Sequence, residues 1–305
     1  MDIKLGADPE FFLIGKYRKH VSAHNLVQGT KHKPYPLNKG ALQADGTAVE
    51  FNIDAASNPT EFAQNITTVL GQVRDIVPKE YTFNFSPAIH YNTQYFDQEI
   101  PESAKELGCD PDFDAWNGGA VNPRPQPALG FRTASGHLHI GWTDDADVKD
   151  PEHLDDCMAV VRRLDYYFGG VSAFWETDID VARRRLYGNW GAFRPKKYGV
   201  EYRVLGNTWL KYPKMWPWLF EFVNHAVNSL ENGITDDNLV IKPELDLKTG
   251  KLNRTRSIPQ PPCGVPRNSY SLKSHRYLYE LSRNEAYKKL PKGAPVFDID
   301  AFLVE

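Results

Sequence analysis

Hydrophobic residues recur at two different spacings along most of the chain. Alternation of apolar and polar positions is typical of strands with one buried face, and it predicts strands over residues 3–14, 46–54, 81–91, 129–143 and 198–205. Apolar positions three and four residues apart predict helices over 59–77, 151–173 and 214–230. The first two helices each begin with a capping side chain followed by a proline, at Asn58-Pro59 and Asp150-Pro151.

The order of these elements predicts the fold class. Strands follow one another in pairs or runs, whereas a parallel sheet or a TIM barrel would place a helix after almost every strand. We therefore expect an α+β fold, with a curved antiparallel sheet and helices packed on one of its faces. Residues 1–231 would form this domain, and the glycine- and proline-rich stretch 110–127 is expected to be a long loop.

Four of the predicted strands carry an unusual polar face. Residues two apart point to the same side of a strand, which pairs Asp8 with Glu10, Glu50 with Asn52, His137 with His139, and Glu201 with Arg203. Any one pair could be an ordinary solvent-facing side. Together they contain almost no lysine, threonine or serine, and acidic residues are poor strand formers. The four faces therefore predict one shared site.

The residue types on these faces favour a metal site. Carboxylates with a histidine on one concave face suit a divalent cation, and mostly oxygen ligands favour Mg²⁺ or Mn²⁺ over zinc. The His137-x-His139 pair alone is weak evidence, because such pairs also occur in zinc hydrolases. Glu201-x-Arg203 adds a fixed guanidinium beside a carboxylate, an arrangement that suits a phosphate bridged to the metal.

A basic segment precedes the Glu201-x-Arg203 strand. Residues 183–197 hold six cations and two glycines, which is consistent either with a solvated basic loop or with a phosphate clamp. Neither a Walker A sequence nor a dinucleotide-binding glycine pattern occurs in the chain. A P-loop or Rossmann protein is therefore not expected.

Composition narrows the class of protein further. Hydrophobic residues make up 41 % and charged residues 25 %, as in ordinary globular proteins, and the net charge of −3 argues against a general polyanion binder. No apolar run approaches the roughly 18 residues of a membrane span, and the N-terminus does not resemble a signal peptide. The cysteines form no CxxC pair, so we expect a reduced, cytoplasmic protein without a cysteine metal site.

Residues 232–305 are expected to form a separate, basic and proline-containing extension. Between Arg254 and Lys292 there are nine lysines and arginines against two acids. This extension could be solvated and wrap the acidic body, could contact nucleic-acid phosphates, or could cover the substrate with its tyrosines.

Five short motifs occur in order along residues 5–210. They are Gly6-Ala7-Asp8-Pro9-Glu10, Asp45-Gly46 with Glu50-Phe51, Gly136-His137-Leu138-His139-Ile140-Gly141, Arg185 with Tyr187-Gly188, Gly191 and Arg194, and Gly199-Val200-Glu201-Tyr202-Arg203 with Asn207 and Trp209. In this order they resemble the phage-type carboxylate–amine ligases (amidoligases), which belong with glutamate–cysteine ligase and glutamine synthetase. Ser135 and Gly206 depart from the family pattern, where glycine and serine respectively are frequent.

The resemblance implies a fold and a reaction. The sheet would curve into a funnel that holds metal ions and a nucleotide. ATP would phosphorylate a carboxylate, and an amine would then attack the acyl phosphate to form an amide with release of ADP and phosphate. The expected cofactors are ATP with Mg²⁺ or Mn²⁺, and the cytoplasm would be that of an infected bacterium.

The resemblance also implies roles for individual residues. The metal ligands would be Glu10, Glu50, His139 and Glu201, with His137 either a further ligand or a residue that orients a neighbour. Arg203 would stabilise the transferred phosphoryl group or the acyl-phosphate oxygens. The charge of nucleotide or substrate would be held by Arg185, Arg194 and Lys196, of which the two arginines would also be catalytic. Only supporting roles are expected for Asp8 and Asp45.

Two other functions stay open. A metal-dependent hydrolase would use the histidine pair and the carboxylates without a nucleotide. A non-catalytic nucleic-acid or protein binder would use the basic extension. For the ligase, the partners would be a small-molecule or peptide carboxylate and an amine, neither of which the residues identify.

Overall fold

The computed structural model describes residues 2–105, 112–126, 128–172 and 175–231, together with Pro295 and the backbone of 244–246 and 251–253. The expected extension over 232–305 therefore lies almost entirely outside the described residues, and its boundary stays a prediction. The side chain of Arg185 is also outside them, although its backbone belongs to a described helix.

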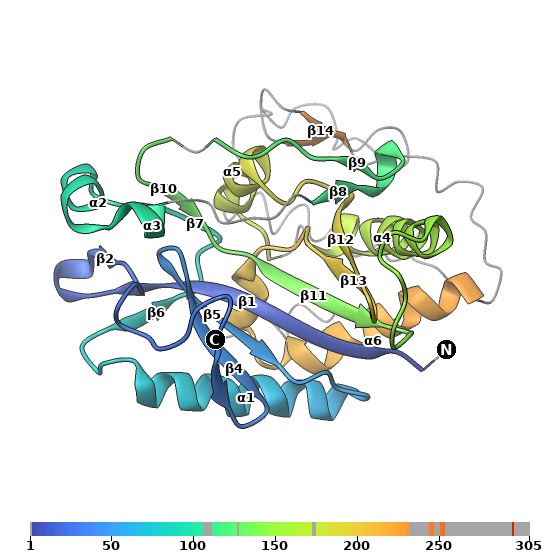
Figure 1. Ribbon diagram of the computed structural model, residues 1–305, viewed down its shortest axis with the longest axis horizontal. Coiled ribbons are helices and arrows are strands. Elements are labelled where there is room, and N and C mark those ends of the chain that lie inside the picture. Colours follow the sequence, from blue (N-terminus) through green and yellow to red (C-terminus); the bar gives the residue numbers. More distant parts are fainter. Residues whose placement is uncertain are drawn as a thin grey trace, which may run out of the picture.

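One antiparallel sheet runs through the molecule (Figure 1). Its central strands are β4 (Gly40–Asp45), β5 (Ala48–Ile53), β1 (Lys4–Ile14), β11 (Gly136–Gly141), β13 (Gly199–Tyr202) and β12 (Ala192–Lys196), in that order across the sheet. Beyond them lie β3 (Tyr35–Leu37) at one edge and β8 (Phe113–Asp114) and β9 (Ala120–Val121) at the other, while β2 (His20–Val21) and β6 (Thr82–Asn84) also pair with β1. Within the described residues this sheet is open and does not close into a barrel.

Two smaller sheets complete the described strands. In one, β7 (Ala88–His90) pairs with β10 (Phe131–Thr133), and in the other, β14 (Glu244–Asp246) pairs with β15 (Lys251–Asn253). All of the strand pairs are antiparallel, which agrees with the predicted α+β fold.

Three long helices accompany the large sheet: α1 (Pro59–Ile76), α4 (Pro151–Val171) and α6 (Met215–Glu231). The predicted caps are confirmed, since the Asn58 side chain accepts from the Glu61 amide and the Asp150 side chain accepts from the Glu152 amide. None of the helices in the described part of the chain is long and apolar enough to cross a membrane.

Shorter helical segments join these elements. They are η1 (Lys16–Arg18), α2 (Thr93–Glu99), α3 (Glu102–Lys105), η2 (Ala115–Asn117), α5 (Asp178–Leu186) and η4 (Asn207–Lys211).

The apolar faces of the central strands share one buried core with the three long helices. Phe11, Phe51 and Leu138 are fully buried with Phe62 of α1 and Leu164 of α4. Because neighbouring positions on a strand point to opposite faces, the polar pairs of the same strands lie on the other side of the sheet. The prediction of helices packed on one face therefore holds for α1, α4 and α6, while the funnel shape stays a prediction.

Two predicted strands are each divided in the structure. The single strand predicted over 81–91 is wrong, because β6 belongs to the large sheet and β7 to a smaller one. Phe83 packs on Phe11 in the main core, whereas Ile89 joins a second core around Phe12. The strand predicted over 129–143 is divided in the same way into β10 and β11.

The long loop predicted over 110–127 is corrected for its described part. Residues 113–121 form the hairpin of β8, η2 and β9 at the edge of the large sheet, whereas 122–126 are irregular as predicted. The Asp114 side chain caps the turn by accepting from the Trp116 amide, and Gly118 adopts the left-handed conformation with φ 61°. Glycine here marks a tight turn between paired strands.

Candidate functional site

The strand register aligns the polar residues that the sequence predicts to share a site. Directly opposite one another are Glu10 and Glu50, Asp8 and His137, His139 and Glu201, and Glu201 and Arg194. The polar faces of five adjacent strands, from β5 to β12, thus form one continuous surface.

A carboxylate cluster, defined here as Glu10, Asp45 and Glu50, occupies one end of this surface. Their oxygens lie within 4.8 Å of one another. Burial and the charge of Asp45 raise the pKa of Glu10 to about 8, and burial with neighbouring carboxylates raises the pKa of Glu50 well above its usual value. The pKa of Asp45 is raised by burial too, although the charge of Lys31 opposes this.

Two neutral donors orient the carboxylate cluster. The Gln43 amide donates to Glu50 at 2.6 Å, and the Ser135 backbone amide donates to Glu10 at 2.8 Å. Three carboxylates held this close repel one another when ionised, and a divalent cation would relieve that repulsion. The donor set of oxygens alone fits Mg²⁺ or Mn²⁺.

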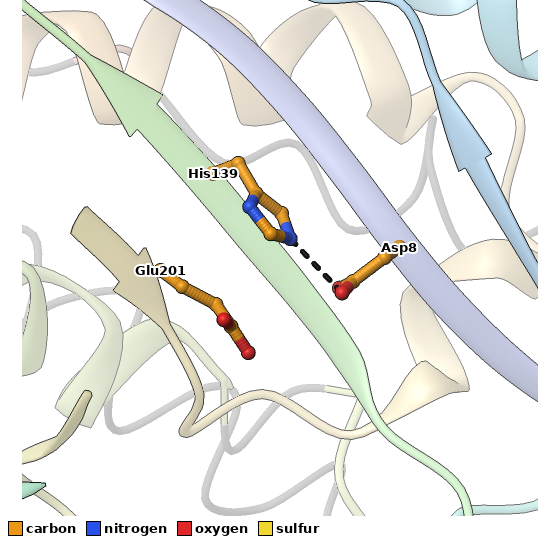
Figure 2. A group of neighbouring side chains, drawn as sticks. All are labelled: Asp8, His139 and Glu201. Carbon is orange, nitrogen blue, oxygen red and sulfur yellow. Dashed lines mark ion pairs between the residues drawn. The ribbon is translucent and has the colours of Figure 1, made fainter. Parts of the chain in front are cut away.

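A second group consists of Asp8, His139 and Glu201 (Figure 2), whose nearest ligand atoms also lie within 4.8 Å. His139 Nε2 lies 3.0 Å from Asp8 Oδ2, and Nδ1 of the same ring contacts the hydroxyl of Tyr198. Burial would lower the pKa of His139 and raise the pKa of Asp8. The attraction between the two charges outweighs burial, so the pKa of His139 is raised and the pKa of Asp8 lies well below its usual value. The two side chains form an ion pair.

His137 lies between the two acids of this second group. Its Nδ1 is 3.4 Å from Asp8 and 3.6 Å from Glu201. Burial and the positive charge of Arg203 lower the pKa of His137 to about 4, so the ring is neutral at pH 7. Its buried Nε2 has no hydrogen-bond partner among the described residues. A neutral ring with a free nitrogen fits both predicted roles, a ligand or an orienting residue.

Cations surround the other side of Glu201. Arg203 Nη1 contacts it directly, Lys196 Nζ lies at 2.7 Å and Arg194 Nη1 at 3.4 Å. Arg203 is also held by Asp112 at 3.3 Å and is almost completely buried. The side chains of Lys196 and Arg194 remain 30 % and 18 % exposed, which leaves both able to meet a ligand.

Residues 126–237 match the family described as Phage phiEco32-like COOH.NH2 ligase-type 2. The predicted resemblance to the phage-type amidoligases is thereby confirmed. The match includes His137, His139, Glu201 and Arg203, whereas Glu10 lies before it. The family name supports a carboxylate–amine ligase. A search of curated proteins found no match.

Two carboxylates have a larger place in the candidate site than the sequence predicts. Asp8 and Asp45, expected to support other residues, each belong to one of the two groups of candidate ligands. Asp8 could have been found, because it shares a strand face with Glu10. Asp45 ends β4, a strand that the sequence pattern does not predict, so the motif that joins Asp45 to Glu50 was the one signal that could have placed it among the ligands.

The basic segment 183–197 is not one solvated loop, and its role as a phosphate clamp stays a prediction. Its first residues end α5 and its last ones form β12. Arg183 is buried and donates to the carbonyl of Val204 and the hydroxyl of Ser135, both at 2.9 Å. Arg184 is buried against Glu176. Among the described side chains of the segment, those of Arg194 and Lys196 reach Glu201.

The two departures from the amidoligase motifs lie opposite each other. Ser135 and Gly206 form an isolated antiparallel bridge. Ser135 provides the hydroxyl that accepts from Arg183, while a Cβ at Gly206 would stand 2.7 Å from Asp180 Oδ1. The structure therefore accommodates a side chain on one side of this bridge and glycine on the other.

Proposed function

We propose that this protein is an ATP- and Mg²⁺-dependent ligase that joins a carboxylate to an amine through an acyl phosphate. The observation that carries the proposal is the neighbouring arrangement of carboxylates and cations on one face of the sheet. Asp8 of the second group and Glu10 of the carboxylate cluster lie two residues apart on the same face of β1, so the two regions adjoin. A metal–phosphate complex requires both kinds of charge together.

The carboxylate cluster would hold one divalent cation, Mg²⁺ or Mn²⁺. The second group, Asp8, His139 and Glu201, together with His137, offers a mixed set of oxygen and nitrogen donors for another. A divalent cation bound here would neutralise phosphate oxygens and polarise the phosphoryl group that is transferred.

The cations would act on the anionic parts of nucleotide and substrate. Arg203 is fixed between Glu201 and Asp112, so its guanidinium needs little reorganisation to stabilise developing charge. Arg194 and Lys196 are more exposed and would hold a phosphate as it enters. For Arg185 the same role rests on the motif alone.

The reaction conserves atoms and charge in two transfers. A carboxylate oxygen of the substrate bonds to the γ-phosphorus of ATP as the bond to ADP breaks. The amine nitrogen then bonds to the acyl carbon, phosphate leaves with the shared oxygen, and the nitrogen loses a proton. Oriented groups and fixed charges are the expected sources of rate enhancement in both steps. The substrates would be small molecules or peptides in the cytoplasm.

A metal-dependent hydrolase is the second candidate, because Asp8, His139 and Glu201 would also suit zinc. Metal analysis of the purified protein separates the two. Stoichiometric zinc and no nucleotide binding would favour the hydrolase.

Binding of a non-hydrolysable ATP analogue tests the ligase without knowledge of its substrate. Calorimetry should detect binding that requires Mg²⁺, and Glu50→Gln should weaken it at least about tenfold, because one buried ligand charge is lost. Glu80→Gln, on an exposed carboxylate, is the matched control. Mg²⁺-independent binding, or equal binding by both variants, would contradict the proposed metal site.

Turnover gives the second test. Amines and carboxylates are screened together for ADP release, and the active pair is then repeated with Glu201→Gln and Arg203→Ala. Both variants should lose ADP release. Turnover that persisted in both would disprove the assignment of these residues.

A further inference from the structure

A cavity of about 590 Å³ lies between α1, β6, η4 and the start of α6. Binding sites for small ligands typically have 300–1,000 Å³, so its size is sufficient for one organic molecule. Figure 1 shows α1 running below the sheet.

The interior of this cavity is apolar and rich in aromatic rings. Leu210 and Trp216 are buried and form its inner wall, while Phe83, Phe85 and Tyr212 are half-buried beside them. The indole nitrogen of Trp216 already donates to the carbonyl of Trp209 at 3.3 Å. Its ring therefore presents apolar surface to a ligand.

Three cations surround the opening. Arg74, Lys211 and Lys214 all line the cavity and are exposed, and no acidic side chain is among the lining residues. Arg74 is held over the Phe83 ring, with its guanidinium carbon 4.2 Å from the ring centre. Among the described residues, none of these three cations has an ion-pair partner. The charge at the opening is thus available to an anion.

The cavity is separate from the proposed ligase site. Phe83 and Phe85 both pack on Phe11, whose side chain points to the helix-covered face of β1. The adjacent Glu10 points to the opposite face, where the carboxylate cluster lies. A ligand in the cavity would not contact the candidate metal ligands.

We propose that this cavity binds a small organic anion with an apolar body, an aliphatic or aromatic carboxylate. The aromatic wall would bury the body of the ligand, and the three cations would pair with its carboxylate at the opening. An uncharged ligand of the same shape would gain only the burial of its apolar body against the aromatic wall. The assignment does not depend on the proposed ligase function.

The fluorescent anion 8-anilinonaphthalene-1-sulfonate serves as the probe on the full-length protein. Titration should give saturable binding at one site. Two carboxylates then compete with the probe to distinguish the two kinds of ligand. Displacement by decanoate indicates an aliphatic anion, and displacement by 2-naphthoate indicates an aromatic anion. Decanol, which has the same chain length as decanoate without the charge, should displace the probe at least about tenfold less well.

Variants locate the binding. Lys211→Glu with Lys214→Glu should weaken probe binding at least about tenfold, because two attractive charges become repulsive. Lys16→Glu with Lys149→Glu makes the same charge change at two exposed lysines that do not line the cavity. This control should change the affinity for the probe less than about twofold. Leu70→Trp fills the cavity from α1 and should abolish binding. Circular dichroism establishes that each variant is folded.

Several results would overturn the proposal. The first two are equal binding of the probe by both double variants and unchanged binding of the probe by folded Leu70→Trp. The others are displacement of the probe by decanol as effectively as by decanoate, and failure of both carboxylates to displace it. Loss of probe binding together with dimer formation at high protein concentration would show that a second copy covers the cavity, and would overturn it equally.

Discussion

Replacing Asp165 by asparagine should make the protein's stability less sensitive to pH. Asp165 lies on α4 and is completely buried behind the candidate site, where it accepts from Trp116 Nε1 at 2.6 Å and from the Tyr202 hydroxyl at 2.8 Å. Burial raises the pKa of Asp165 from 3.8 to about 7, although these two hydrogen bonds and one from the Gly191 backbone oppose the change. The folded protein therefore keeps a proton at pH values where the unfolded chain has lost it.

The sign and size of the effect follow from this difference in pKa. The contribution of Asp165 to stability is complete below pH 3.8 and is lost as the pH rises through about 7. At about 1.4 kcal/mol per pKa unit the total loss is about 4 kcal/mol, of which roughly 2–3 kcal/mol falls between pH 5 and pH 8. Asparagine stays neutral throughout, and because an NH₂ group replaces one acceptor oxygen, at least one hydrogen bond is lost, at a cost of about 1 kcal/mol.

Urea unfolding at pH 5, 6, 7 and 8 measures the free energy of unfolding of the wild type, of Asp165→Asn and of the control Asp155→Asn. The control changes an exposed carboxyl of the same helix. The free energy of unfolding of Asp165→Asn, relative to wild type, should rise by roughly 2–3 kcal/mol from pH 5 to pH 8. The control should stay parallel to wild type. A difference between Asp165→Asn and wild type that is constant to about 0.5 kcal/mol over this range would refute the reasoning.

Three further predictions concern stability. Arg184→Met leaves the buried carboxylate of Glu176 without its ion-pair partner, so the free energy of unfolding in urea should fall by about 3–5 kcal/mol. Adding Glu176→Gln should recover much of this loss. A loss below about 1 kcal/mol for Arg184→Met would contradict the prediction. Gly188→Ala should cost at least about 2 kcal/mol, because φ is 76° and a Cβ would stand 2.5 Å from Arg183 Nη1, whereas Gly71→Ala on α1 meets no atom and should be neutral or stabilising. Mg²⁺ should raise the Tm by a few degrees and EDTA should reverse this, since a cation held by the carboxylate cluster would have no such site in the unfolded chain. An unchanged Tm would count against the proposed metal site.

Much of the fold was predictable because its signals are local. The helix that begins at Pro59 needs only its cap and its apolar spacing, both of which are present in twenty consecutive residues. The strands β1, β5, β11 and β13 likewise follow from alternation, which also assigns each polar side chain to one face. Where a short strand depends on its neighbour, as β4 and β12 do, the sequence pattern was insufficient.

The division of residues 81–91 shows why the remainder needed the whole structure. Phe83 and Ile89 are both apolar and fit one alternating pattern, and Pro87 between them marks a break without showing where each part packs. Their separation follows from two different cores, one under the long helices and one around Phe12. Which core receives a side chain is decided by segments far away in sequence.

By itself, then, the sequence determined which polar side chains share a strand face, because the alternation of a strand is a property of the backbone. Only the tertiary structure decided which of them meet. The register pairs Glu10 with Glu50 and His139 with Glu201, and a shift by one residue would turn each side chain away. Burial and neighbouring charges then set whether Asp8 stays ionised and Glu10 keeps its proton, and these depend on strands that the chain brings together only by folding.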